Sequence, residues 1–282
     1  MAIQFQQHPG LVVYLTAGDN GLSSQSPAKP GEAVDLTLTR DIALAAIDAG
    51  ADVIELGVPF SDPLADGPVI QRASERAVAR GTRLIDVLGL AKEIRHARPE
   101  AGLVIFTYLN PVLRFGMAKF ADAAAAAGVD GVLLTDMIVE EGAEYIAEME
   151  RVNLAPVFLA APTSSDERLA AIAEHSKGFI YAISRTGVTG QQQSVASDAA
   201  ALVDRIRKAM HWRKLPVAVG FGISNADHVA QVAEFADAAV IGSAIVELIE
   251  KSAPGKAPDA VARFIQDLFT KGLRQPHLAQ AL

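Results

Sequence analysis

Three acidic side chains stand close together in the segment ELGVPFSDPLADGP, which covers positions 55–68. Glu55 lies in an apolar, strand-like run, where a glutamate is costly because strands disfavour it and burial penalises its charge. One explanation is an ion pair across the strands. The other is a carboxyl whose pKa is raised toward neutrality, so that it can both donate and accept a proton. Asp62 and Asp66 follow among prolines, where aspartate commonly makes turns, and spacing alone leaves open which would be catalytic.

Glycines later in the chain suggest a binding site for phosphate. GFG at 220–222 and GS at 242–243 each follow a strand-like run, and a short helix is predicted over 243–251. Glycines let the backbone approach a ligand closely, and the first turn of a helix offers free N–H groups and the positive end of its dipole. Tight turns are the structural alternative. Because two such turns occur in succession, we expect a phosphate site that needs no arginine.

The elements that would position these groups alternate regularly along the chain. Eight nearly continuous apolar runs predict buried parallel strands, at 11–16, 52–56, 102–108, 131–135, 156–160, 179–184, 216–221 and 238–243. Amphipathic, alanine-rich stretches between them predict helices, at about 37–49, 83–97, 117–127, 139–151, 165–175, 197–210, 225–234 and 258–270.

Eight strand–helix units predict an α/β fold, a (β/α)8 TIM barrel that forms a single domain over 1–282, with 243–251 as a short extra helix after the eighth strand. A doubly wound open sheet is the rival, but no GxGxxG follows the first strand. We expect a loop insertion at 21–33 and a glycine- and glutamine-rich loop at 187–197.

The residue types missing from the strand ends narrow the chemistry. No lysine or histidine stands at the carboxyl end of a predicted strand, and the chain has no cysteine. A Schiff-base mechanism and a metal site of histidines or thiolates are therefore not expected, although carboxylates alone could hold Mg²⁺. General acid–base chemistry by carboxylates and tyrosines fits what remains.

Composition limits the partners and the compartment. The net charge of −8 and the pI of about 5.3 argue against nucleic acid or an anionic membrane surface as a partner. No apolar run approaches the roughly 18 residues of a membrane span, and the first residues do not resemble a secretory signal. With no cysteine, a cytoplasmic protein is the default expectation.

The segment ELGVPFSDPLADGPVIQ at 55–71 closely resembles the characteristic motif of the tryptophan synthase alpha subunit family. Six further motifs follow the family's order along the chain: YLTAGD (14–19), TYLNP (107–111), GVDGVLLTD (128–136), SRTGVTG (184–190), GFGIS (220–224) and IGSAIV (241–246).

The resemblance implies a TIM-barrel lyase that cleaves indole-3-glycerol phosphate to indole and glyceraldehyde 3-phosphate. Indole then passes to a beta subunit containing pyridoxal phosphate, in an alpha2beta2 complex, and this chain itself carries no cofactor or metal. A standalone lyase that releases free indole is the alternative. A catalytically weak binding homologue is a third reading, against which the intact Glu55 and Asp66 argue.

The motifs also imply roles for individual residues. Glu55 matches the family's general acid–base, Asp66 its second carboxylate, and Asp62 a position at the contact with the beta subunit. Phosphate-binding positions correspond to Gly190, Gly222, Gly242 and Ser243. Positions around the substrate correspond to Tyr14, Tyr108, Leu133, Tyr181 and Phe221, with Thr189 in a mobile loop over Asp66. Two departures are the insertion at 21–33 and the absence of the helix that usually precedes the first strand.

Overall fold

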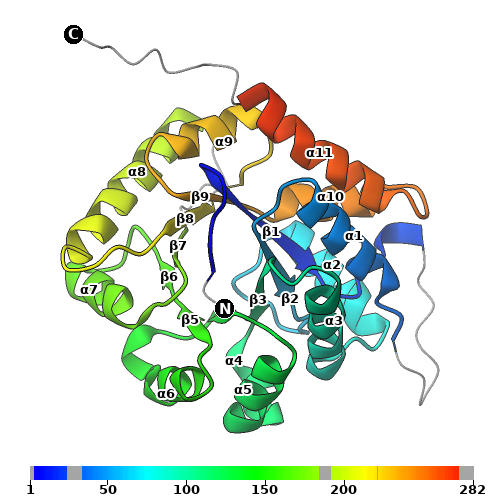
Figure 1. Ribbon diagram of the computed structural model, residues 1–282, viewed down its shortest axis with the longest axis horizontal. Coiled ribbons are helices and arrows are strands. Elements are labelled where there is room, and N and C mark those ends of the chain that lie inside the picture. The colour runs from blue at the N-terminus through cyan, green and yellow to red at the C-terminus, as the bar shows by residue number, and fades with distance from the viewer. Residues whose placement is uncertain (1–2, 24–33, 184–191, 221, 273–282) are drawn as a thin grey trace.

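The computed structural model describes residues 3–23, 34–183, 192–220 and 222–272. In these residues, nine parallel strands form a nearly closed ring in the order β5-β4-β3-β2-β1-β9-β8-β7-β6, with helices outside it (Figure 1). The predicted (β/α)8 barrel is thereby confirmed.

The strands follow the predicted positions closely. They are β1 (Gly10–Thr16), β2 (Val53–Gly57), β3 (Gly102–Thr107), β4 (Gly131–Leu134), β5 (Ala155–Val157), β6 (Leu159–Ala160), β7 (Ile180–Ile183), β8 (Val217–Gly220) and β9 (Ala238–Ile241). The predicted strand at 156–160 is divided into β5 and β6 at Phe158, which is buried against Tyr145 with ring centroids 5.6 Å apart. In the described strand order, β5 and β6 are the two ends, so the ring is open at this division.

The helices of the described residues include two that were not predicted from the sequence, α2 and α4. The α-helices are α1 (Thr37–Asp48), α2 (Pro68–Ala79), α3 (Leu84–Ala97), α4 (Leu109–Phe115), α5 (Met117–Ala126), α6 (Ala143–Arg151), α7 (Asp166–His175), α8 (Gln192–Ala209), α9 (Ala226–Ala233), α10 (Ser243–Lys251) and α11 (Ala257–Gly272). Short 3₁₀ turns are η1 (Gly21–Ser23) and η2 (Val139–Glu141). The extra helix after the last strand is present as α10.

The loop predictions are tested only in part. Of the insertion at 21–33, the structure describes η1, and residues 24–33 lie outside the described ranges. Of the loop at 187–197, residues 187–191 lie outside them, whereas α8 already begins at Gln192. In the described residues, no helix is long and apolar enough to cross a membrane.

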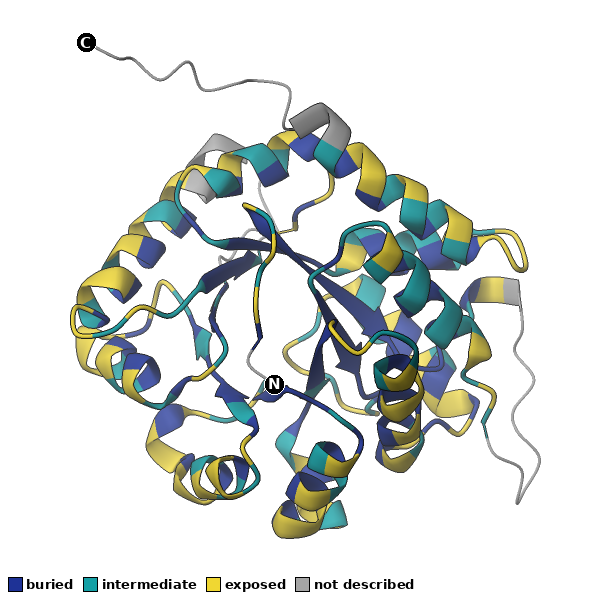
Figure 2. Ribbon diagram, viewed as in Figure 1, coloured by how far each residue is buried: buried dark blue, intermediate teal, exposed yellow. Residues whose placement is uncertain are grey.

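Alternation along each strand separates two apolar layers, since successive side chains point to opposite faces. The strands and the inner faces of the helices are buried, and the outer faces of the helices are exposed (Figure 2). One layer packs the strands against the helices. The other, here called the inner cluster, lies inside the barrel and comprises Ile3, Val12, Val53, Val104, Leu133, Val157, Phe179, Ala218, Ala238 and Val240.

The described residues before β1, 3–9, complete the inner cluster and form no helix. Ile3 is 7% exposed, and Phe5 packs edge-on against Phe179 with ring centroids 6.1 Å apart. A Cβ on Gly178 would lie 2.8 Å from Cδ1 of Ile3, so this segment packs closely on the amino end of β7. The side chains of this segment thus take part in filling the floor of the barrel.

Truncating Ile3 tests this arrangement. Ile3→Ala is expected to lower the free energy of unfolding by about 2–5 kcal/mol, because it removes buried methyl groups and leaves a cavity. Urea unfolding followed by circular dichroism measures the change. Ile85→Ala, the same truncation at a side chain that is 47% exposed, serves as the control. Equal losses in the two variants would contradict the packing of Ile3 on the barrel floor.

Candidate active site

The carboxyl group of Glu55 is buried inside the barrel. Glu55 lies two residues after Val53 of the inner cluster, so its side chain points to the same interior face of β2. It is 0% exposed, and among the described residues neither carboxyl oxygen has a hydrogen-bond partner. The ion pair weighed in the sequence analysis is therefore not formed there. Burial raises the pKa of Glu55 to about 8, so the carboxyl is mostly protonated at neutral pH.

Asp66 is the second carboxylate of the site, and Tyr108 holds it. The hydroxyl of Tyr108 donates to Oδ2 of Asp66 at 3.1 Å and accepts from the backbone N–H of Ala65 at 2.9 Å. Burial raises the pKa of Asp66 to about 6, although the hydrogen bond from Tyr108 opposes the shift. Asp66 is therefore mostly ionised near pH 7, where Glu55 is mostly protonated.

Two tyrosines lie near both carboxyl groups. Burial raises the pKa of Tyr14, and the charges of Asp66 and Glu55 raise it further. Burial also raises the pKa of Tyr181, with Glu55 and Asp66 again adding to the shift. The structure thus brings Glu55, Asp66, Tyr14 and Tyr181 into one site, in which both tyrosines remain neutral.

Glycines on the neighbouring strands make room for these two phenol rings. A Cβ on Gly57 would lie 2.2 Å from the hydroxyl oxygen of Tyr14, and one on Gly220 would lie 2.7 Å from that of Tyr181. Each glycine stands on the interior face, two residues after Glu55 in β2 and two after Ala218 in β8. Any larger residue there would displace a tyrosine from the mouth of the barrel.

Phe106 lies in the same mouth and was not among the site residues predicted from the sequence. Its ring meets that of Tyr14 edge-on, with centroids 5.0 Å apart. The signal was present in the strand alternation, because Phe106 stands two residues after Val104 of the inner cluster and two before Tyr108. Leu133, predicted to line the pocket, is a fully buried member of the inner cluster and pairs in register with Phe106.

The predicted phosphate positions lie beside this aromatic mouth. Gly242 immediately precedes α10, and a Cβ there would lie 3.6 Å from Cβ of Tyr14. Ser243 begins α10 and is exposed. Gly222 has a φ of +78°, which favours glycine, and a Cβ on it would meet nothing within 4 Å. Gly190, Thr189 and Phe221 lie outside the described residues.

Asp62 lies apart from the chemistry just described. It is exposed, and its carboxylate accepts a hydrogen bond of 2.5 Å from the hydroxyl of the neighbouring Ser61. Leu64, in the same loop, is 93% exposed. The structure therefore separates the two aspartates that spacing alone left equivalent: Asp66 is held beside Tyr108, and Asp62 points to solvent.

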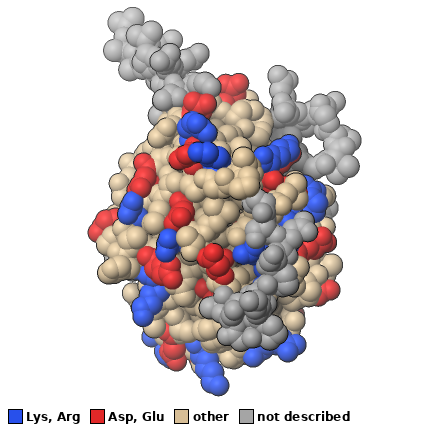
Figure 3. Space-filling view, turned by 90° about the vertical axis from the view of Figure 1, so that its right-hand side faces the viewer, with Lys and Arg blue, Asp and Glu red and all other residues tan. Residues whose placement is uncertain are grey.

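The described residues bear on metal and nucleic-acid binding through the grouping of their metal-binding side chains and the distribution of their charged side chains. They contain no group of three or more His, Cys, Asp or Glu side chains that could hold a metal. On the face seen in Figure 3, acidic and basic side chains are interspersed among the described residues. The expectations of no metal and no nucleic-acid partner stay predictions.

The raised pKa of the buried Glu55 carboxyl predicts how stability depends on pH. The pKa of Glu55 is about 8 in the folded protein and near 4.5 as an unperturbed glutamate, so between these values the native state binds more protons than the unfolded state. Stability contributed by this group therefore falls as pH rises from about 4.5 to 8. Glu55→Gln is expected to remove that dependence and to stabilise the protein at pH 8 by a few kcal/mol, since one pKa unit is about 1.4 kcal/mol.

Urea unfolding of both proteins between pH 5 and 8.5 measures the effect. Asp62→Asn, which changes an exposed carboxylate, is the control and should follow the parent protein. A Glu55→Gln curve parallel to that of the parent would show that Glu55 is ionised throughout.

Comparison with known proteins assigns the sequence of this chain to a family. The family model described as tryptophan synthase alpha chain matches residues 2–271. The tryptophan synthase alpha chain of Solibacter usitatus is 46% identical over 98% of this chain and 95% of its own, and that of Cupriavidus metallidurans is 45% identical over 95% and 94%.

Solved structures agree with these relatives. A chain of Mycobacterium tuberculosis tryptophan synthase superposes with a TM-score of 0.80 at 35% identity, covering 95% of this chain and 94% of that one. Tryptophan synthase subunit alpha from Legionella pneumophila gives a TM-score of 0.80 at 33% identity, covering 94% and 92%. This chain belongs to the tryptophan synthase alpha chain family.

Proposed function

We propose that this chain cleaves indole-3-glycerol phosphate to indole and glyceraldehyde 3-phosphate by general acid–base catalysis, with Glu55 as the proton shuttle. The observation that carries the proposal is the buried carboxyl of Glu55, which has no hydrogen-bond partner among the described residues and a pKa of about 8. A buried polar group without a partner is costly, and a substrate that supplies the missing contacts explains why it is kept.

The reaction needs one residue to act first as an acid and then as a base. Protonated Glu55 delivers its proton to C3 of the indole ring, which turns the ring into a leaving group. The positive charge spreads to the ring nitrogen, where ionised Asp66 accepts the N–H hydrogen bond and stabilises the cation. Glu55, now ionised, removes the proton of the C3′ hydroxyl as the C3–C3′ bond breaks and the aldehyde forms.

The remaining proposed contacts orient the substrate. Tyr14, Phe106 and Tyr181 would surround the indole ring, with Tyr108, Leu133 and Phe221 as further pocket positions. The phosphate would bind at Gly222, Gly242 and Ser243, where the first N–H groups of α10 have no partners within the helix. Gly190 and Thr189 complete the proposed site.

The proposed chemistry needs neither a metal ion nor a cofactor in this chain. Two carboxyl groups with separated pKa values supply both proton transfers and the charge stabilisation. We assign pyridoxal phosphate to a separate beta subunit, which would receive indole in an alpha2beta2 complex located in the cytoplasm.

The surface around Asp62 is the proposed contact with that subunit. Exposed apolar side chains follow three successive strands at this end of the barrel: Leu64 in the loop after β2, Leu113 in α4 after β3 and Ile138 in the loop after β4. The hydrogen bond from Ala65 to Tyr108 joins the loop after β2 to the residue that precedes α4. Apolar side chains gathered at one edge are typical of a protein contact.

Replacing Glu55 tests the acid–base assignment. Glu55→Gln keeps the shape but cannot exchange the proton, so kcat for indole release should fall by about 10²–10⁴-fold. Indole formed from indole-3-glycerol phosphate is the measurement. Asp62→Asn should retain the activity of the isolated chain, and unchanged indole release by Glu55→Gln would refute the role of Glu55.

The two pKa values predict a bell-shaped pH profile. In kcat/KM, activity should fall below about pH 6 as Asp66 becomes protonated, and above about pH 8 as Glu55 becomes ionised. Asp66→Asn should flatten the acid limb and leave the alkaline one. A profile that kept its acid limb without Asp66 would mean that another group titrates there.

Titration with a purified beta subunit tests the partnership. We expect indole release to rise and saturate, and Leu64→Ser to require about ten times more beta subunit for the same effect. Trp212→Ser, which changes another exposed side chain at the amino end of β8, is the control. Full activity without a beta subunit, and no response to it, would favour the standalone lyase.

A further inference from the structure

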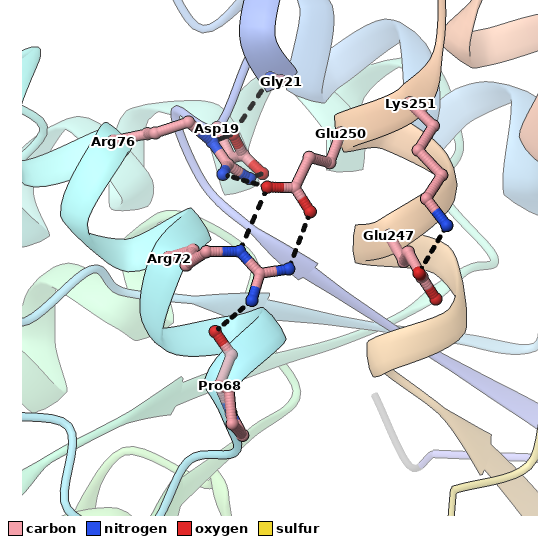
Figure 4. A network of polar contacts seen from close by, with 8 residues as sticks. All are labelled: Asp19, Gly21, Pro68, Arg72, Arg76, Glu247, Glu250 and Lys251. Atoms are coloured by element: carbon pink, nitrogen blue, oxygen red, sulfur yellow. Dashed lines mark hydrogen bonds and ion pairs between the residues drawn. The ribbon is translucent and has the colours of Figure 1, made fainter.

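An ion-pair network joins three segments that are distant in the sequence (Figure 4). Arg76 of α2 binds both oxygens of Asp19, through Nε at 2.8 Å and Nη2 at 2.9 Å, and its Nη1 donates to Glu250 of α10 at 2.8 Å. Arg72, one turn earlier, binds both oxygens of Glu250 at 3.2 and 2.9 Å. The network thus connects the loop after β1, α2 and α10.

Burial distinguishes this network from ordinary surface ion pairs. The side chain of Asp19 is 2% exposed, that of Arg76 14% and that of Glu250 13%. Exposed pairs contribute little, whereas removing one member of a buried pair leaves an uncompensated charge and is costly. The three groups therefore hold their positions more firmly than a surface contact would.

Backbone contacts reinforce the same junction. The N–H of Gly21 in η1 donates to Asp19 at 3.0 Å. A Cβ on Gly21 would lie 2.6 Å from the carbonyl oxygen of Ile249, so η1 lies directly against the end of α10. The carboxyl end of α10 is thus held from two sides.

Each helix in the network leads to one end of the proposed substrate site. α2 begins at Pro68, two residues after Asp66, and the side chain of Gln71 donates to the carbonyl oxygen of Asp66 at 2.9 Å. Arg72 Nη1 also donates to the carbonyl oxygen of Pro68 at 3.3 Å. α10 begins at Ser243, the proposed phosphate end. Since a helix is stiff over a few turns, fixing α2 to α10 fixes Asp66 relative to Ser243.

We propose that Arg76 is a positioning residue which, through Asp19 and Glu250, sets the separation between the Asp66 carboxylate and the phosphate site at the start of α10. The inference rests on the proposed function, because it assigns the two ends of one substrate to these two places. The buried network of Asp19, Arg76 and Glu250, which lies outside the site, would thus determine how well the two ends of the substrate fit these two places.

A change in the separation between Asp66 and the phosphate site should alter affinity only for ligands that contact both places. A ligand that occupies two sites gains affinity from their correct separation, and the gain is lost when the geometry no longer fits. A fragment that fills one end does not depend on the separation. A general loss of structure, by contrast, would weaken all ligands alike.

Calorimetric titration with three probes separates these cases. The probes are indole, glycerol phosphate and an unreactive analogue in which a three-carbon chain joins indole to phosphate. In Arg76→Gln, the Kd of the analogue should rise at least tenfold while those of the two fragments stay within about twofold. Arg76→Lys keeps the charge but loses the planar fork that binds Asp19 and Glu250 together, so it should not restore the affinity.

A milder variant and a matched control complete the experiment. Arg72→Gln changes an exposed arginine, should fold normally, and should weaken the analogue by about two- to fivefold. Arg95→Gln is the control, because Arg95 pairs with buried Asp130 and is 16% exposed, at the amino end of the barrel. It should lower thermal stability without changing any of the three affinities.

The outcomes distinguish this inference from the function on which it rests. Parent-like binding of the analogue by Arg76→Gln and Arg72→Gln would overturn the positioning role, as would equal loss for all three probes. If the parent protein binds the analogue no more tightly than glycerol phosphate, the proposed function itself fails, and the inference fails with it.

Discussion

The buried, unpartnered carboxyl of Glu55 is the constraint to which the rest of the site is fitted. An ionised carboxylate without a partner inside a barrel is costly, so the protonated form is favoured and the pKa of Glu55 rises to about 8. The inner cluster beneath it, from Ile3 to Val240, supplies apolar burial that offsets the cost. Function at the mouth therefore depends on dense packing at the floor.

The layer around Glu55 is shaped by large and small residues on neighbouring strands. Tyr14 pairs in register with Glu55, and its hydroxyl extends over Gly57, while the hydroxyl of Tyr181 extends over Gly220. A large ring on one strand is possible only because the next strand carries no side chain at that height. The glycines keep the mouth open, and the neutral phenols form its walls without adding charge.

Much of the fold could be predicted from the sequence, because runs of apolar residues mark buried strands locally. The positions of the strands and their arrangement as a parallel barrel follow from these runs, and the structure confirms them. α2 and α4 were missed because a template with one helix per strand left no place for them, although Pro68 stands at a favourable first position. The division at Phe158 depends on packing against Tyr145, which no local pattern reveals.

Local sequence is equally unable to reveal the tertiary contacts of the site residues. The sequence left Asp62 and Asp66 equivalent until a family motif distinguished them, and only the tertiary bond from Tyr108 gives a physical reason. The network of Asp19, Arg76 and Glu250 was not predicted at all, since its members are separated by most of the chain. Barrel closure places β9 beside β1, and this brings α10 against α2. The distance between Asp66 and the proposed phosphate site at the start of α10 is therefore set by closure of the barrel. It cannot be derived from the sequences at the individual strand ends.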